Sequence, residues 1–465
     1  MNKELNNRAN KQLPVFILIL FLLLGFTPAI NAETFSLDQA IDRALSSDPR
    51  INEKQAFVRH ARALLAEAEG NGAIFISANS FVGFSPGLSG GLFGDESCGN
   101  SKECVSRDDR FDLNEGLSPW FYLEYGVIKP LSTFGKIENF ALAARHNIQV
   151  KTQDVRLQRG STIYDVKRAY FGHLTAKNSR LFLQDVKKRI DNAKAEIETL
   201  LDEGEGEATP ADLYALQSAS ALARSYVIRA EALERVALDG LKVLMGVNLS
   251  DDISLADTSV KPVSLPVLNL VDLQAKAMIE RPEMTQLTEG LDARRALVKA
   301  KKAMKKPNLY AGVIGSLSYS PLRDRVDNPH IADPFNDMGT TPVVGMQWQW
   351  AGAVQGAHVQ QATAELEALV EKGNFAQRGI PYQVAESFSQ VHAMHEALLE
   401  MRKSSKAARK WMVSSYADFQ AGVEEVDKLV TAFTAYVTTY TDYLQLVYAY
   451  NMQVANLDQV TGAYQ

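Results

Sequence analysis

Apolar residues recur at alternating spacings of four and three along two stretches of the chain, which is the pattern of a coiled-coil seam. The first stretch consists of Val186, Ile190, Ala193, Ile197 and Leu200. The second consists of Val430, Phe433, Val437, Tyr440, Leu444 and Val447. Each seam predicts a long helix that packs along one narrow stripe, and residues 134–201 alone would form a rod of about 100 Å.

The first seam ends at a predicted hairpin tip, over residues 201–212. Gly204 and Gly206 stop the helix, because glycine adopts positive φ at little cost. Thr209 is suited to cap the next helix and Pro210 to be its first residue. Asp212 follows where the helix dipole favours an anion. The sequence therefore predicts an acidic helical hairpin, whose return helix runs to about residue 247.

A second tip, over residues 416–427, has the same order of features. Gly422 precedes Glu424, Glu425 and Asp427, and the second seam follows. Other positions also repeat, 233 residues apart. The matched sets are Leu37, Ala44, Leu45, Pro49, Ile51, Ala63 and Leu64, and Leu270, Ala277, Met278, Pro282, Met284, Ala296 and Leu297. The chain is therefore predicted to be an internal duplication.

In four short segments, apolar side chains recur at every second position. This pattern predicts strands over residues 73–84, 120–131, 308–319 and 343–350. Such strands could be half-buried in a soluble sheet. We favour lipid-facing strands, because no compact domain surrounds them and an export signal precedes them. Trp120, Trp348 and Trp350 are then expected at the membrane interface.

The N-terminus predicts a secretory signal over residues 1–32. Basic residues precede an apolar core over residues 15–24, and Ala32 provides a small residue before the cut. An uncleaved anchor is the alternative, although the apolar core is short for one. The remaining chain divides into a first repeat, a linker and a second repeat, over residues 33–250, 251–268 and 269–465.

The charge and the cysteines fit an exported protein. The signal contains three basic residues and one acidic residue, so the mature chain has a formal charge of −8, which argues against binding nucleic acid. Cys98 and Cys104 are the only cysteines and lie in a stretch rich in Gly, Ser and Asp. We expect a local disulfide there, and two free thiols are the alternative.

Nothing in the sequence indicates an enzyme or a cofactor. It contains no nucleophile elbow, no set of four metal ligands and no phosphate-binding loop. His392 and His395 have the spacing of a helical metal pair, but two ligands are too few for a metal site, and a surface pair is the simpler interpretation.

The strands and helices both require neighbours. Four strands cannot close a barrel, since even small barrels need about eight, and open strand edges are not tolerated in lipid. The long seams are too narrow for one globule. Both arguments predict a ring of several copies, with a membrane end and a helical end.

This order of elements resembles the outer membrane efflux proteins, the TolC-like outer membrane factors, over essentially the whole mature chain. The most specific segments are GEGEATPADLYALQSA at the first tip, the breaks at Asp48-Pro49 and Arg281-Pro282, and VIKPLSTFG over residues 127–135. The fourth strand departs from this pattern, because Trp350-Ala351-Gly352-Ala353 stands where a Pro-Leu-Phe-like exit would be.

The resemblance implies a homotrimer in the outer membrane, extending into the periplasm. Four strands per chain would give a twelve-stranded β-barrel, continued by an α-helical tunnel that docks onto a periplasmic adaptor and an inner membrane pump. The chain would be a passive exit duct for efflux or type I secretion. Its gate is expected at Gly204, Thr209, Asp212, Gly422, Glu424, Glu425 and Asp427.

Three alternatives stay open. The acidic tips are either a cation-attracting constriction or solvated loops, and Asp212 is the best candidate for a bond between neighbouring hairpins. A periplasmic coiled-coil adaptor or scaffold is the rival function, which would have lipoyl-like or sandwich strands instead of amphipathic ones. Drugs and proteins are not distinguished as cargo.

Overall fold

The protein is described from a computed structural model over residues 33–89, 113, 115–204, 208–324 and 333–463. The signal segment, Cys98 and Cys104 lie outside the described residues. Three pairs of elements have equal lengths and are 233 residues apart, as the sequence predicts. These pairs are α2 (Leu37–Ser47) with α6 (Leu270–Glu280), α3 (Pro49–Gly70) with α7 (Pro282–Ala303), and β2 (Phe75–Pro86) with β5 (Asn308–Tyr319).

The next strand and the two long helices of each repeat follow in the same order. They are β3 (Leu117–Ser132) with β6 (Asp337–Gln347), α4 (Lys136–Glu203) with α8 (Gly352–Gln420), and α5 (Pro210–Met245) with α9 (Val426–Thr461). The long helices begin and end within a few residues of the predicted positions. No helix of the described chain is both long and apolar enough to cross a bilayer.

Two compact units cut across the repeats. The first comprises Met1–Asp48, Ser161–Val267 and Ser389–Leu457, and the second comprises Pro49–Gly160, Leu268–Phe388 and Asp458–Gln465. Each unit takes segments from both halves of the sequence. The division into residues 33–250 and 269–465 thus describes a sequence repeat and not a pair of separately packed domains.

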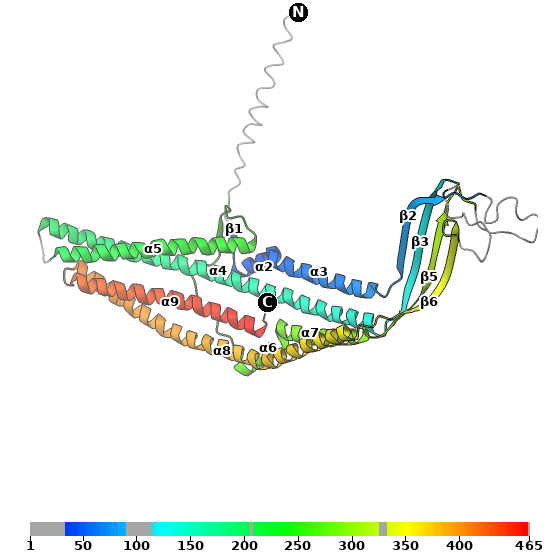
Figure 1. Cartoon of the computed structure of the whole chain (residues 1–465). Coiled ribbons are helices and arrows are strands. Elements are labelled where there is room, and N and C mark those ends of the chain that lie inside the picture. The colour runs from blue at the N-terminus through cyan, green and yellow to red at the C-terminus, as the bar shows by residue number, and fades with distance from the viewer. Residues whose placement is uncertain (1–32, 90–112, 114, 205–207, 325–332, 464–465) are drawn as a thin grey trace, which may run out of the picture. The chain divides into compact units, whose positions relative to one another are not determined.

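The first unit is built around the two seams that the sequence predicts. Val186, Ile190, Ala193 and Ile197 of α4 are buried against residues of α5, α8 and α9. The same cluster contains Leu216, Ala223, Ala408, Met412, Phe419, Val426, Leu429, Ala432, Phe433 and Tyr436. In Figure 1, α5 lies along the C-terminal part of α4, and α9 lies along α8. The hairpins therefore supply one another's apolar partners.

The predicted linker is more ordered than the sequence indicates. It contains β4 (Ile253–Leu255), which pairs in parallel with β1 (Glu33–Phe35). The following segment is fixed by side chains of the long helices. The Val260 amide donates to Asn178 Oδ1 at 2.7 Å, and the Val263 amide donates to Asn451 Oδ1 at 2.9 Å. Because these side chains satisfy its backbone groups, the segment needs no sheet of its own.

The second unit contains a four-stranded antiparallel sheet in the order β2-β3-β5-β6 (Figure 1). Its register pairs Phe81 with Tyr122, Leu123 with Leu317, and Val313 with Pro342. The β2–β3 pair of the first repeat and the β5–β6 pair of the second therefore join through β3 and β5. Strands β2 and β6 are the edges of the sheet in a single copy.

The fourth strand differs from the prediction. It begins at Asp337, six residues before the predicted start, and ends at Gln347, so Trp348 and Trp350 follow the strand. Gly339 and Pro342 make its first half resemble a loop in sequence. An edge strand tolerates proline, because half of its N–H groups point away from its only partner.

Candidate functional site

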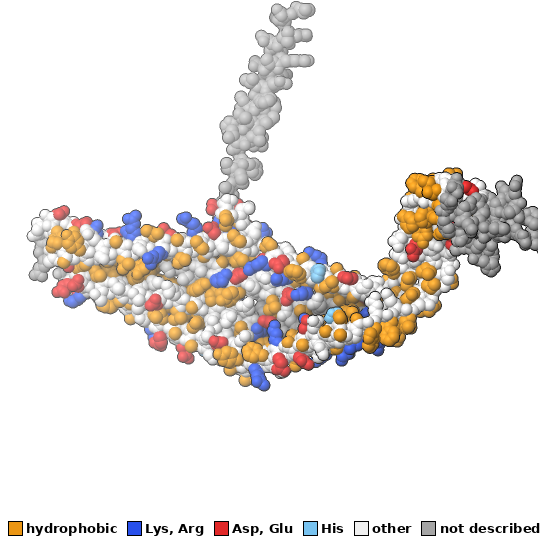
Figure 2. Space-filling model, in the orientation of Figure 1, with side chains coloured by type: hydrophobic (Ala, Val, Ile, Leu, Met, Phe, Trp, Pro, Cys, Tyr) orange, Lys and Arg blue, Asp and Glu red, His pale blue; other side chains and the backbone are white. Residues whose placement is uncertain are grey.

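One face of the sheet is apolar and exposed. Strand alternation places Ile76, Val82 and Phe84 of β2 on the same face as Val344 and Met338 of β6. These five side chains are 71–81% exposed. Figure 2 shows hydrophobic side chains gathered over the strands. An apolar surface of this continuity indicates contact with lipid or with another protein.

The opposite face is polar or small at most positions. It includes Ser77, Asn79, Glu124, Ser316 and Thr341. The four strands contain only three charged residues, which are Glu124, Lys129 and Asp337. Lys129 is the one on the apolar face, near the helical end of the sheet. The alternation of an apolar and a polar face is typical of a strand between lipid and water.

Two tyrosines lie directly over glycines of neighbouring strands. A Cβ atom at Gly315 would be 2.5 Å from the Tyr125 ring, and one at Gly345 would be 2.5 Å from the Tyr310 ring. Any larger residue would displace these rings, so the glycines are required where an aromatic side chain covers the backbone. These pairs hold β3 to β5 and β5 to β6.

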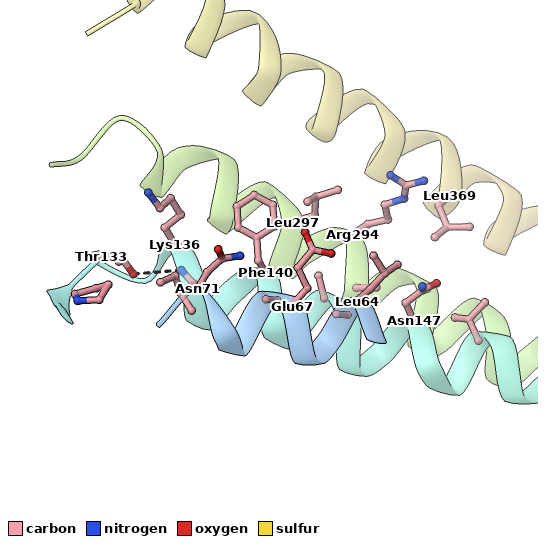
Figure 3. Close-up of a pocket in the computed structure, with 18 of the residues that line it drawn as sticks. Leu64, Glu67, Asn71, Thr133, Lys136, Phe140, Asn147, Arg294, Leu297 and Leu369 are labelled. Carbon is pink, nitrogen blue, oxygen red and sulfur yellow. Dashed lines mark hydrogen bonds between the residues drawn. The ribbon is translucent and has the colours of Figure 1, made fainter. Parts of the chain in front are cut away.

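A cavity of about 1490 Å³ opens at the helical end of the polar face. Its lining includes polar-face residues of all four strands, among them Phe75, Ile128, Tyr310 and Gln347. Figure 3 shows the helical part of the wall, to which α3, α4, α7 and α8 contribute. The labelled side chains there include Leu64, Glu67, Phe140, Arg294, Leu297 and Leu369.

The cavity combines an apolar wall with charged groups, several of which have polar partners. Lys136 Nζ donates to Asn308 Oδ1 at 2.9 Å, and Arg294 forms an ion pair with Glu365. Asp154 accepts from Lys151 at 3.0 Å. This cavity was not predictable from the sequence, because its lining comes from scattered positions on eight elements and forms no local motif.

The other end of the sheet is closed by a polar cluster. Arg323 Nε donates to Asp333 Oδ2 at 2.9 Å, and both side chains are almost fully buried. Ser320 Oγ forms hydrogen bonds with Ser85 Oγ at 2.7 Å and Ser118 Oγ at 2.6 Å. These contacts fix the described ends of the β5–β6 connection against the polar face.

The three tryptophans expected at the membrane interface lie in two different settings. Trp120 is on the polar face, where its Nε1 donates to Ser318 Oγ at 2.7 Å and its ring contacts Phe81 and Phe335. This differs from the expected lipid interface. Trp348 and Trp350 lie at the helical end of β6, are 56% and 72% exposed, and contact one another edge to face. These two retain the exposure that an interfacial role requires.

The first hairpin tip is organised by a capping box. Gly204 has a φ of 66° after the end of α4. Thr209 caps α5, and Asp212 Oδ2 accepts from the Thr209 amide at 2.8 Å and from Thr209 Oγ1 at 2.7 Å. In one copy, the carboxylate of Asp212 therefore stabilises its own helix, and among the described residues it bonds only within this box.

The second tip ends α8 in a Schellman motif. Gly422 has a φ of 72°, and its amide donates to the carbonyl oxygen of Phe419. The Val423 amide donates to the carbonyl oxygen of Asp418 at 2.9 Å. Lys428 lies 3.2 Å from Glu424 and 4.0 Å from Glu425. The hydrogen bond that Lys428 donates to the Glu424 carboxylate raises the pKa of Lys428. Asp427 lies in the first turn of α9 and is exposed.

Polar contacts also join the helices behind the first tip. Ser220 Oγ of α5 donates to Asp191 Oδ1 of α4 at 2.5 Å, and Lys187 donates to the other oxygen. Burial opposes ionisation of Asp191, but these two hydrogen bonds outweigh it and lower its pKa. Further along, Arg180 forms a bidentate pair with Glu234, and hydrogen bonding to that carboxylate raises the pKa of Arg180.

Comparison with solved structures shows that most of the chain is similar in fold to bacterial outer membrane proteins. The CmeC outer membrane channel of Campylobacter jejuni is 12% identical with a TM-score of 0.74, over 92% of this chain and 85% of that one. VceC of Vibrio cholerae, an outer membrane protein, is 12% identical with a TM-score of 0.72, over 92% and 96%. The open MtrE channel of Neisseria gonorrhoeae is 16% identical with a TM-score of 0.71, over 92% and 88%.

These similarities confirm the TolC-like fold that the sequence predicts, with long helices and two strands in each repeat. No protein-family model and no curated protein matches the sequence.

Proposed function

We propose that this protein is an outer membrane channel and acts as the passive exit duct of a tripartite export system. The single observation that carries the proposal is the amphipathic sheet with two unpaired edges. Its apolar face can contact lipid, and its polar face can line water. β5 has 12 residues, or about 41 Å of strand, which at a tilt of about 40° spans about 31 Å, close to the thickness of the hydrocarbon core.

The open edges favour assembly as a trimer. In lipid, the unpaired groups of β2 and β6 would each cost several kcal/mol, so the edges must pair between copies. Three copies would close a twelve-stranded barrel. A heptad pattern of exposed apolar side chains on α5 supports the same assembly, since no described residue of one copy covers it. It consists of Leu222, Tyr226, Leu233, Val236 and Val243, which are 39–68% exposed.

The rival function, a periplasmic adaptor or scaffold, fits these features less well. Such a protein should bury its strands in a lipoyl-like or sandwich domain, whereas this sheet exposes an apolar face. The solved structures with this fold that we compared are outer membrane proteins. We therefore place the chain in the outer membrane, with its helices in the periplasm, and assign it no catalytic role.

The hairpin tips are the proposed contact with a periplasmic adaptor and, through it, with an inner membrane pump. Gly204, Thr209 and Asp212 lie at one tip, and Gly422, Glu424, Glu425 and Asp427 lie at the other. The described residues of both tips include exposed acidic groups, so basic side chains of a partner would complement them. Opening at this end would release cargo into the duct.

Conductance across a planar lipid bilayer tests the proposal. The detergent-extracted oligomer should insert and give discrete current steps, and its mass should equal three chains. A protein that remains soluble and monomeric without detergent would support the adaptor instead. Correctly inserted trimers that never conduct, even with the tips weakened by Asp212→Ala or Asp427→Ala, would refute a pore.

A further inference from the structure

Glu124 is the one charged residue in the middle of the polar face. It is exposed, and its cross-strand neighbours are the neutral residues Asn79 and Ser316. Among the described residues, no hydrogen bond or ion pair engages its carboxylate. Asp337, two residues further toward the outer end by register, is also acidic. The four described strands place no lysine or arginine on this face, so no strand residue compensates its negative charge.

An aromatic cluster begins next to this carboxylate. The Phe81 ring stacks on Tyr122 at 4.8 Å between centroids and meets Trp120 edge to face at 5.0 Å. Tyr122 and Glu124 are two residues apart on one strand face, which separates them by about 7 Å. A single small molecule can therefore contact the rings and the carboxylate at once.

Two described cations flank the polar face, and neither pairs with Glu124. Arg323 is buried and paired with Asp333. Lys136 bonds Asn308, which lies eight residues along β5 from Ser316, or about 27 Å. That distance exceeds the Debye length of about 10 Å at 0.1 M salt, so its field is screened at Glu124.

We propose that Glu124 and the rings of Phe81, Trp120 and Tyr122 form a binding step for cationic aromatic molecules inside the duct. This inference rests on the proposed function, because the polar face lines water only in the assembled channel. The carboxylate attracts the positive charge, and the ring faces bind it through cation–π and stacking contacts. Each copy supplies one such step, so the assembly presents a ring of them.

Reversal potentials in a KCl gradient around 0.1 M measure the charge contribution. Glu124→Gln should lower the cation-over-anion permeability ratio by about two- to fourfold, since a unit charge about 5 Å away in water changes ion occupancy by about fourfold. Glu124→Lys should shift it further toward anions. The matched control is Lys129→Gln on the apolar face, which should leave the ratio unchanged. The tip acids are common to all variants.

Current block by added ions distinguishes the contribution of the aromatic rings to binding from that of the Glu124 carboxylate. Benzyltrimethylammonium should block the wild type more strongly than tetramethylammonium, and benzenesulfonate should block it least. Tyr122→Leu should weaken block by the aromatic cation alone, whereas Glu124→Gln should weaken block by both cations. If Glu124→Gln channels conduct with the selectivity and block of the wild type, this inference is overturned, whereas the proposed channel function stands. A wild type that never conducts would overturn both.

Discussion

Replacing Asp212 by alanine distinguishes a helix cap from a gate. In the structure, its carboxylate accepts two hydrogen bonds from Thr209. The Thr209 hydroxyl oxygen accepts a hydrogen bond from the Asp212 amide at 3.3 Å. Loss of a cap costs about 1 kcal/mol, within a range of about 0.5–2. Local opening at the start of α5 should then become about fivefold more frequent. Amide hydrogen exchange over residues 208–220 measures this change directly.

Thr209→Ala provides the matched comparison, because it weakens the same capping box from its other side. The double variant should lose less than the sum of the two single losses, since the residues act as one unit. Asp202→Ala, in the last turn of α4, should leave exchange at α5 unchanged. If Asp212→Ala raises conductance while exchange over residues 208–220 keeps its wild-type rate, Asp212 acts as a contact between hairpins and the capping argument is refuted.

Three further predictions concern assembly and packing. Leu233→Asp on the exposed heptad of α5 should prevent trimer formation, whereas Arg224→Asp on the opposite face of the same helix should not, as native mass measurement would show. Gly345→Ala should reduce the yield of folded channel, because its Cβ would meet Tyr310, while Gly339→Ala has open space and should be tolerated. Ser220→Ala should lower the thermal midpoint at neutral pH, and this loss should shrink as the pH falls. The reason is that Asp191, with its lowered pKa, stabilises the fold only while it is ionised. Equal losses for both members of any pair, or a Ser220→Ala effect that is constant with pH, would contradict these expectations.

The sequence was sufficient for the order of elements, because periodicity and helix breakers act locally. Proline at positions 49 and 282 divides the short helices in both repeats, and the predicted strand over residues 308–319 matches β5. The prediction for β6 was less accurate, because Gly339 and Pro342 indicate a loop unless the strand is known to be an edge. β4 was missed because three residues carry too little pattern.

The functional site was less predictable than the fold. Alternation along β3 does place Trp120 with Tyr122 and Glu124, so its polar-face position was available from the sequence. The capping role of Asp212 also follows from its spacing to Thr209. The cavity depends on where scattered residues of several helices and strands meet, and that information exists only in the folded chain.

Disulfide trapping across the sheet edges tests the central claim that several copies share one barrel. Cys98 and Cys104 are first replaced by serine. Ala78→Cys on β2 is then combined in turn with cysteine at Met338, Thr340, Val344 or Met346 of β6, all on the same face. If copies share one barrel, one register and its neighbours give covalent dimers and trimers, and neither single cysteine gives any. Monomers alone in every combination, from protein inserted in a membrane, would contradict it.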